Sequence, residues 1–480
     1  MDDLLSLFER RRMLVLVFAF LGFDHLDGRM TACYNVSLCS GRRDISGGTR
    51  LPPKRERDVD RMRDAQRGKV PLDRIWPIGW LVYFISYFTR YNYSAAMVAI
   101  AEAEGFDTGM TGLIASALFV CYGAGQMIAG WLGERCDPRR MVFAGLFGSA
   151  ICNGVMGLSG SYPLMLAAWG INGLMCAMIW APMVRLLTIV LPHDRQRRAM
   201  LSFSYSTALG QAGTYLLVSF LTVWLPWRYA FFVPTVLAAA VALLWLFSVP
   251  RDCAAGALLA PAADEAPAAA APGTARRGRV WLISGLPAIL CAILLMGVLK
   301  DGILTWVPQM VKDTFGTSTS LSIFLSAVLP VVTVASVPLV KLLCRLCRSD
   351  DMIVSAVLYG GAAVGMLLLL LFGGTSPAAA IVLFSLVATL VSGVNAVLIS
   401  FIPLRYAAFG LTAVVAGLTN AVTYLGSALS GFGIGAVAQH GGWRTVEELL
   451  LALCAAGIVC CAAIRPVWRR FCAADPNGEN

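Results

Sequence analysis

Charged residues are scarce in this sequence. Only 14% of its 480 residues are Asp, Glu, Lys or Arg, whereas 58% are hydrophobic, and the mean hydropathy is +0.72. Soluble domains carry a charge on about a quarter of their residues. The composition therefore excludes a soluble globular protein and predicts a chain that crosses a membrane several times.

The sequence also lacks the usual signatures of catalysis and metal binding. It has no phosphate-binding glycine loop, no zinc-ligand spacing and no Ser/His/Asp set, and His25, His193 and His440 lie outside the apolar segments. Its 14 cysteines have no paired spacing, so we interpret them as small apolar residues. We predict no enzyme activity, no cofactor and no metal site.

Apolar segments of membrane-spanning length recur along the chain in two groups of six. The first group covers residues 76–100, 111–132, 141–158, 163–191, 199–221 and 227–247, and the second covers residues 280–305, 320–343, 352–372, 378–401, 411–438 and 445–464. This pattern predicts an all-α membrane protein with twelve transmembrane helices in two pseudo-symmetric six-helix bundles, residues 74–250 and 280–466.

The remaining segments are polar or of low complexity. Residues 1–73 contain no spanning segment, and we expect an N-terminal extension that is disordered or a misassigned start, with Met62 as an alternative start. Residues 251–279, rich in Ala and Pro, predict a flexible cytoplasmic linker. Residues 467–480 are expected to form a cytoplasmic tail.

Basic residues gather in the connections on one side of the predicted helices. If both chain ends are cytoplasmic, the outer connections hold only three basic residues, Arg228, Lys312 and Arg444. This asymmetry follows the positive-inside rule. We therefore predict a multi-pass protein of the cell (inner) membrane with both termini in the cytoplasm, and we do not interpret the net charge of +10 as a nucleic-acid surface.

Arg90 lies in the middle of the first apolar segment, where a guanidinium costs at least ~2.5 kcal/mol. At the helical period Tyr83, Tyr87 and Ser94 share its face. A planar fork of donors flanked by tyrosines suits a phosphate or carboxylate. The alternative is a structural arginine that pairs with the carbonyls or a carboxylate of a neighbouring helix.

The two groups of segments resemble repeats of each other. Trp227-Arg228 opens the sixth segment and Trp443-Arg444 the twelfth, 216 residues later, while Lys300 follows Arg90 by 210 residues. In transporters built from repeats, equivalent midplane positions line one central site. We therefore predict that Arg90 and Lys300 face each other, with coincidence between common residues as the alternative.

The stretch GWLGERCDPRR, residues 130–140, resembles the loop signature of the major facilitator superfamily, although Glu134 stands where aspartate is usual and Asp137 where glycine is usual. An acidic residue beside paired arginines can form a charge cluster. We predict a gating latch that ties the bundles together on the cytoplasmic side, made by Glu134, Arg135, Arg139 and Arg140. A loop that serves only membrane topology is the alternative.

Four stretches resemble the organophosphate:phosphate antiporters, the glycerol-3-phosphate and hexose-phosphate transporters: YFISYFTRYN, ERCDPR, KDGILTWVP and AGLTNAVTYLGS. The resemblance implies that Arg90 grips phosphate and that Lys300 stands where the family has a second arginine. It also implies a cavity lined by Tyr83, Tyr87, Tyr122 and Tyr424.

The sequence departs from this family at the cavity. Gln126 stands where the glycerol-3-phosphate branch carries a lysine, Thr207 where it carries a histidine, and Lys300 lacks the bidentate geometry of arginine. Asp301 adds a carboxylate that need not neutralise Lys300 directly, since adjacent residues on a helix point about 100° apart. The site is thus expected to take a substrate with fewer negative charges, or to carry a proton on Asp301.

These observations predict a secondary active transporter of organic anions. We expect phosphorylated sugars or glycerophosphate-like compounds, exchanged for inorganic phosphate by alternating access at an Arg/Lys clamp. A proton-coupled carboxylate transporter and a transporter-like receptor for a sugar phosphate are the alternatives. The expected partners are the small organic anion, phosphate or a proton, and the lipid bilayer, with the protein a monomer.

Overall fold

The computed structural model describes residues 72–133, 136–190, 193–249, 284–347, 350–409 and 411–473, which belong to one compact unit, Ala65–Asn480. The described residues are helical, apart from short connections, and contain no strand. The predicted extension up to residue 71, the linker at 251–279, and Glu134 and Arg135 of the predicted latch lie outside them.

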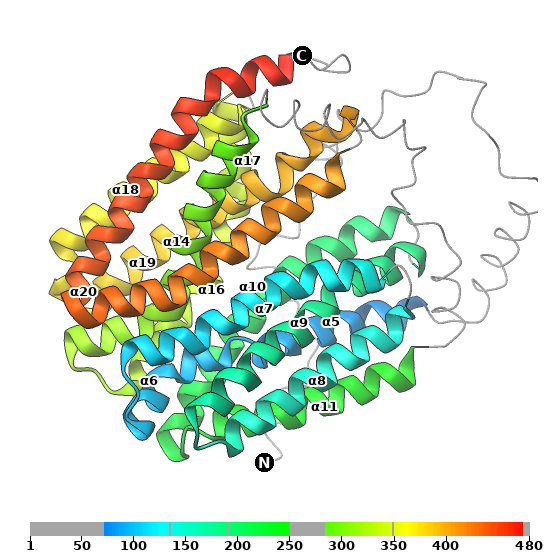
Figure 1. Ribbon diagram of the computed structural model, residues 1–480, viewed down its shortest axis with the longest axis vertical. Helices are drawn as coiled ribbons and strands as arrows, with labels where there is room; N and C mark the ends of the chain where they lie inside the picture. Colours follow the sequence, from blue (N-terminus) through cyan, green and yellow to red (C-terminus); the bar gives the residue numbers. More distant parts are fainter. Residues whose placement is uncertain are drawn as a thin grey trace, which may run out of the picture. The chain divides into compact units, whose positions relative to one another are not determined.

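The first bundle contains the helices of the first six predicted segments (Figure 1). The first segment is divided into α5 and α6, and each of the next five forms one helix. The helices are α5 (Leu72–Phe88), α6 (Asn92–Glu104), α7 (Thr108–Gly133), α8 (Pro138–Leu158), α9 (Tyr162–Val190), α10 (His193–Trp224) and α11 (Tyr229–Ser248).

The second bundle contains the helices of the other six segments and is less regular. It consists of α14 (Leu286–Phe315), α15 (Thr319–Ser326), α16 (Val328–Val332), η2 (Thr333–Ala335), α17 (Ser336–Leu346), α18 (Asp351–Phe372), η3 (Gly373–Thr375), α19 (Pro377–Asn395), the π-helical η4 (Ala396–Phe401), η5 (Pro403–Phe409) and α20 (Thr412–Ala473). Four short elements, α15 to α17, together form the eighth span. Helix α20 bends at Gly442, where φ is 74°, and so holds the last two spans and continues into the predicted tail.

The twelve predicted spans are present in this arrangement. In the described part of the chain, nine helical segments are long and apolar enough to cross a membrane, and the four elements of the eighth span count as one of them. One of the nine is α20, which crosses twice. Helices α5 and α6 are too short singly, at 17 and 13 residues, but together make the first span. Helix α10, rich in Ser and Thr, makes the fifth. The prediction of a twelve-helix membrane protein in two bundles is confirmed.

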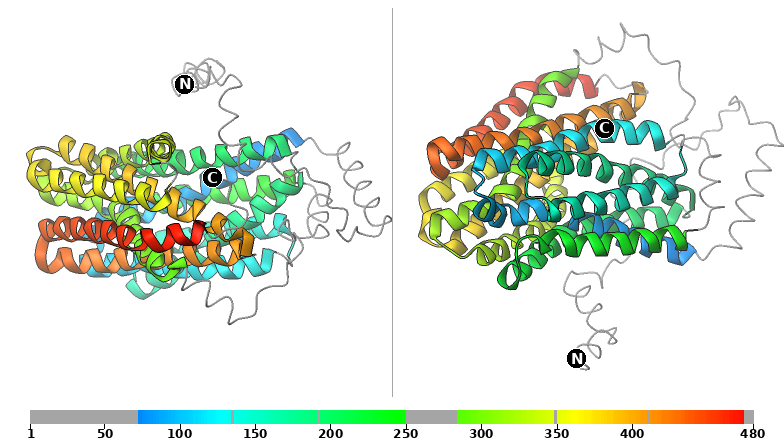
Figure 2. Two further views of the ribbon diagram at one scale, coloured as in Figure 1. Left: turned by 90° about the horizontal axis from the view of Figure 1, so that it is seen from above. Right: turned by 60° about the horizontal axis from the view of Figure 1, so that its bottom comes forward.

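Helices α7 and α20 join the bundles near one end, which we call the loop end because residues 105–107, 159–161, 225–228 and 316–318 connect helices there. The first half of α20 (orange) runs beside α7 (cyan) in Figures 1 and 2. Ser116 Oγ donates to the Ala428 carbonyl at 2.6 Å. A Cβ on Gly112 would lie 2.3 Å from the Gly431 oxygen, so only glycine permits this approach.

A second set of contacts closes the loop end between α10 and α14. Tyr215 Oη donates to the Leu304 carbonyl at 2.6 Å. This carbonyl lacks its helical partner because Pro308, four residues later, has no N–H. At the surface, Glu102 accepts a hydrogen bond from Thr319 and pairs with Lys312. The bundles are therefore held together at the loop end.

We expect Tyr215→Phe to loosen the loop end. The substitution leaves the Leu304 carbonyl unpaired between the bundles, and a buried hydrogen bond contributes about 1 kcal/mol, which corresponds to an opening equilibrium about fivefold larger. Hydrogen–deuterium exchange should accelerate in peptides that cover residues 108–116 and 428–435.

Tyr359→Phe is the matched control, because Tyr359 Oη also donates to a helix carbonyl, that of Ala292, at 2.6 Å, but within the second bundle. It should leave exchange in these peptides unchanged. Equal acceleration by both variants would show that Tyr215 has no special role in closing this end.

Candidate functional site

The first predicted span is broken in its middle, at Thr89, Arg90 and Tyr91. The expectation that Tyr83, Tyr87, Arg90 and Ser94 share one face of a continuous helix is therefore wrong. Helix α5 ends at Phe88 and α6 begins at Asn92, and Ser94 is buried within α6. A break deep in the bundle is possible because two side-chain amides, those of Asn172 and Asn153, donate hydrogen bonds to the Thr89 carbonyl, at 2.8 and 3.0 Å.

Arg90 lies among aromatic rings that come from both bundles. Its Cζ is 3.9 Å from the centre of the Tyr122 ring of α7 and 5.6 Å from that of Tyr424 of α20. The rings of Tyr122 and Tyr424 are 4.6 Å apart, and the Tyr91 ring lies 5.4 Å from Arg90 Cζ. We call Tyr91, Tyr122 and Tyr424 the tyrosine cage. A cation over aromatic faces gains about 0.5–2 kcal/mol.

The guanidinium of Arg90 is not paired with a carboxylate among the described residues. Its buried Nε has no hydrogen-bond partner, and among the described residues no carboxylate lies within ion-pair distance of it. The described residues therefore show no carboxylate or carbonyl that pairs with this arginine, as the structural alternative required. A guanidinium held by rings alone keeps N–H donors that are not paired with protein groups.

Tyr83 and Tyr87 line the approach to the cage from α5. Their hydroxyl oxygens are 3.2 Å apart, and the Tyr87 ring stacks on that of Tyr91 with centres 5.7 Å apart. Tyr83 packs against Trp180 of α9, with ring centres 4.8 Å apart. The two predicted cavity tyrosines thus form a continuous row with the cage.

Lys300 and Asp301 form the part of the site that α14 contributes. Lys300 Nζ lies 3.3 Å from Asp301 Oδ2, so the two side chains form a direct ion pair, although adjacent helical positions diverge. The long lysine side chain makes this contact. Ser427 Oγ donates to the same oxygen at 2.5 Å, whereas the buried Asp301 Oδ1 has no partner among the described residues. Lys300 is therefore already partly neutralised.

Residues that the sequence interpretation missed connect and extend these groups. The Tyr91 ring lies 5.4 Å from Arg90 Cζ and stacks on that of Tyr87, so it connects Arg90 with the tyrosines of α5. Thr305 Oγ1 and Gln309 Oε1, one and two turns beyond Asp301 on α14, are buried polar atoms without a described partner. The signal for them is a polar residue at every fourth position of an apolar helix.

The other predicted residues lie apart from the cage. Gln126, half-buried, is one turn after Tyr122 on α7, and Thr207 donates to the Phe203 carbonyl within α10. In the described part of the predicted latch, Arg139 donates to the Leu246 carbonyl and Arg140 lies 3.6 Å from Asp137. These contacts are made inside the first bundle, and an inter-bundle latch stays a prediction.

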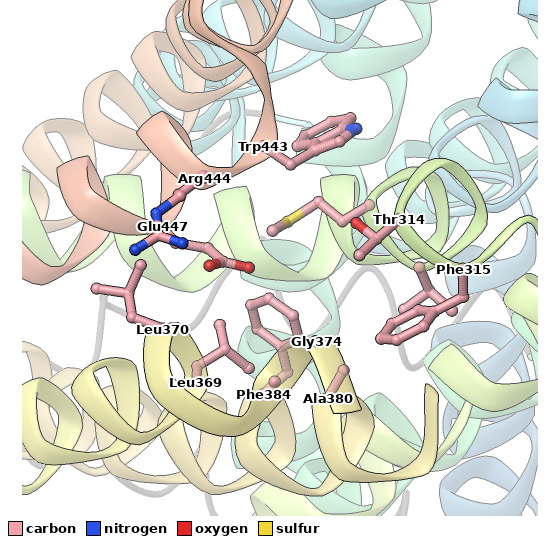
Figure 3. A pocket seen from close by; sticks show the side chains of 13 residues that line it. Thr314, Phe315, Leu369, Leu370, Gly374, Ala380, Phe384, Trp443, Arg444 and Glu447 are labelled. Carbon is pink, nitrogen blue, oxygen red and sulfur yellow. The ribbon is translucent and has the colours of Figure 1, made fainter. Parts of the chain in front are cut away.

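A cavity of about 160 Å³ lies elsewhere, within the loop-end half of the second bundle (Figure 3). Phe384, Trp443, Arg444 and Glu447 line it, and none of the predicted substrate-binding residues does. Among the described residues, no group of His, Cys, Asp and Glu side chains could hold a metal ion. That Arg90 and Lys300 bind an anion stays a prediction.

Comparisons with known proteins agree with this fold. Residues 79–431 match the sequence model of the Major Facilitator Superfamily. A probable hexose phosphate transport protein of Chlamydia trachomatis is 32% identical over 34% of this chain and 36% of its own length, and the glycerol-3-phosphate transporter of Bacillus subtilis is 27% identical over 37% and 40%. The chain thus matches less than half the length of these relatives.

The crystal structure of the nucleoside transporter NupG has a TM-score of 0.64, with 12% identity over 82% of this chain and all of that one, and so shares the fold. The two relatives and this structural neighbour are named as transporters, in agreement with the prediction that the chain is a transporter and not an enzyme. This chain belongs to the Major Facilitator Superfamily.

Proposed function

We propose that the protein exchanges phosphorylated sugars or glycerophosphate-like anions for inorganic phosphate across the cell (inner) membrane, with both termini in the cytoplasm. The observation that carries this proposal is Arg90, a cation deep between two helical bundles with a tyrosine cage and no described carboxylate partner. An uncompensated cation at such a depth is costly, and this favours a functional role.

The names of the two relatives support a phosphorylated substrate. One name refers to hexose phosphate and the other to glycerol-3-phosphate. Both substrates carry a phosphate group, which a guanidinium binds with two parallel hydrogen bonds. Inorganic phosphate carries the same group, so one site can accept either anion in turn.

Electrostatics explain why such a protein would exchange anions. Closing the bundles around Arg90 and Lys300 removes water from two cations, and a low dielectric strengthens their repulsion. Asp301 offsets part of this charge through its ion pair with Lys300. A bound anion offsets the rest, so the loaded protein changes state readily and the empty one slowly.

The contacts at the loop end fit one state of an alternating-access cycle. In the proposed orientation the loop end is the outer side, and it is closed by Tyr215 and by the α7–α20 contacts. Opening it requires these hydrogen bonds to break while the opposite ends of the bundles approach. The site between the bundles would then face the other side.

The proposal predicts that purified protein in phosphate-loaded vesicles takes up a sugar phosphate or glycerophosphate. Arg90→Ala should abolish this exchange, and Arg90→Lys should recover little of it because the bidentate fork is lost. Lys300→Arg should be tolerated, or favour more highly charged phosphates. Radiolabelled substrate uptake measures all three variants.

Arg444→Ala is the matched control, because Arg444 is largely exposed at the loop end and, among the residues that the structure describes, forms an ion pair only with Glu448, at 3.6 Å. It should exchange like the unsubstituted protein. Substantial exchange by Arg90→Ala would make Arg90 structural, and no exchange of any phosphorylated compound by the unsubstituted protein would overturn the proposed function.

We expect Asp301 to act as a fixed counter-charge to Lys300. Asp301→Asn should then raise affinity for doubly charged anions by about tenfold, since close charge pairs couple by about 1.5 kcal/mol or more. The pH dependence of exchange should stay unchanged. Competition by singly and doubly charged anions at several pH values measures both effects.

Ser427→Ala separates charge from hydrogen bonding at this carboxylate, because it removes only the donor to Asp301 Oδ2. It should not change the preference between singly and doubly charged anions. Uptake driven by a proton gradient and lost in Asp301→Asn would contradict the counter-charge role and favour the proton-coupled alternative.

A further inference from the structure

A buried polar network surrounds the break in the first span and includes Cys176, which packs against Tyr122 of the tyrosine cage. We propose that Asn153 of α8 and Asn172 of α9 are positioning residues that hold this break open and thereby aim Arg90 at its anion. The inference rests on the proposed function, since it concerns how that anion is bound.

The centre of the network is the backbone carbonyl of Thr89. Asn153 Nδ2 donates to it at 3.0 Å, and Asn172 Nδ2 donates to it at 2.8 Å. Both asparagines are fully buried. In a continuous helix the N–H of Tyr93 would occupy this carbonyl, because helical bonds join residues four apart. Two side-chain amides on other helices have replaced that bond.

Other side chains hold these asparagines in place. Ser149 Oγ lies 2.6 Å from Asn172 Oδ1 and 2.8 Å from Thr89 Oγ1. Asn92 Nδ2, at the start of α6, donates to Asn153 Oδ1 at 2.7 Å and to the Ala230 carbonyl of α11 at 2.9 Å. The network thus joins α6, α8, α9 and α11, and each asparagine amide nitrogen in it is paired.

The membrane makes such a network necessary wherever a helix breaks. No water is present in the hydrocarbon region to satisfy a freed carbonyl, and each unpaired group costs several kcal/mol. A break therefore persists only where neighbouring helices supply donors. Substituting the donors removes the partner of the Thr89 carbonyl and favours another backbone conformation at Arg90.

The second bundle provides an internal comparison. Asp137 and Asp350 cap the starts of α8 and α18, and their separation (350 − 137 = 213) places Ala362 and Met366 opposite Ser149 and Asn153. Where the second bundle lacks these polar residues, its first helix, α14, runs unbroken from Leu286 to Phe315 through Lys300.

The same comparison holds for Asn172. Ser161 precedes α9 and Ser376 caps α19, and their separation (376 − 161 = 215) places the buried Val387 opposite Asn172. The break and its asparagines thus occur together in the first bundle, and neither is found at the equivalent described positions of the second.

The network acts on Arg90 through the backbone on both sides of this residue. Its hydrogen bonds reach Thr89, the residue before Arg90, and Asn92, the second residue after it. The guanidinium itself lies against the cage, with its Cζ 3.9 Å from the Tyr122 ring. Fixing the turn on both sides of Arg90 fixes where its fork points, and a bidentate contact depends on that direction.

A comparison of arginine with lysine at position 90 tests this role. In the otherwise unsubstituted protein, Arg90→Lys should raise the Kd for inorganic phosphate by about tenfold or more, because only arginine binds bidentately. In the Asn172→Leu background, Arg90→Lys should change the Kd for inorganic phosphate by less than about threefold, since the guanidinium is no longer held in the direction that a bidentate contact needs. Asn153→Leu should act in the same way.

Phosphate affinity is measured by calorimetry on detergent-purified protein, with thermal unfolding recorded for every variant. Asn395→Leu is the matched control, because Asn395 of α19 is only partly buried and has no described side-chain hydrogen bond. It should keep the full difference between arginine and lysine. If one network variant fails to fold, the other serves.

The possible outcomes separate this inference from the proposed function. A network variant that keeps the full difference between arginine and lysine overturns the positioning role, even if it unfolds at a lower temperature. If the unsubstituted protein neither binds nor exchanges phosphate, the proposed function fails and the positioning role fails with it.

Discussion

The pairing of one backbone carbonyl, that of Thr89, is the interaction on which the rest of the site depends. Inside a bilayer a helix can break only where other groups take over its hydrogen bonds. Two asparagine side chains do so here, and the break they allow places Arg90 at the boundary between the bundles. The cage of Tyr91, Tyr122 and Tyr424 then surrounds the guanidinium without neutralising it.

The two bundles treat their central cations differently. Arg90 stands on a turn and interacts with aromatic rings, whereas Lys300 stands within a continuous helix and interacts with Asp301 and, through it, with Ser427. The first arrangement preserves a full positive charge with directional donors, and the second leaves a reduced and less directional charge. A phosphate group would therefore be oriented by the first bundle and adjusted in affinity by the second.

The spans could be predicted from hydropathy alone because lipid demands long apolar segments. The resemblance to known transporters indicated Arg90, Tyr122 and Tyr424, whose side chains lie together in the structure, while their role in binding stays a prediction. The break could not be predicted, because residues 89–91 include neither Gly nor Pro. Its cause lies in Asn153 and Asn172, which are 64 and 83 residues away in the sequence. The Lys300–Asp301 pair was also missed, since helical geometry fixes the direction of Cβ but not the end of a lysine side chain.

The tyrosine cage has a consequence for the direction of transport. Tyr122 and Tyr424 belong to different bundles, so the cage is complete only while these bundles are close at this level. A carrier that dismantles part of its binding site in each cycle holds its cargo with unequal strength at the two membrane faces. Such a carrier reaches half-saturation at different substrate concentrations for influx and for efflux. The equilibrium distribution of the substrate across the membrane is unaffected.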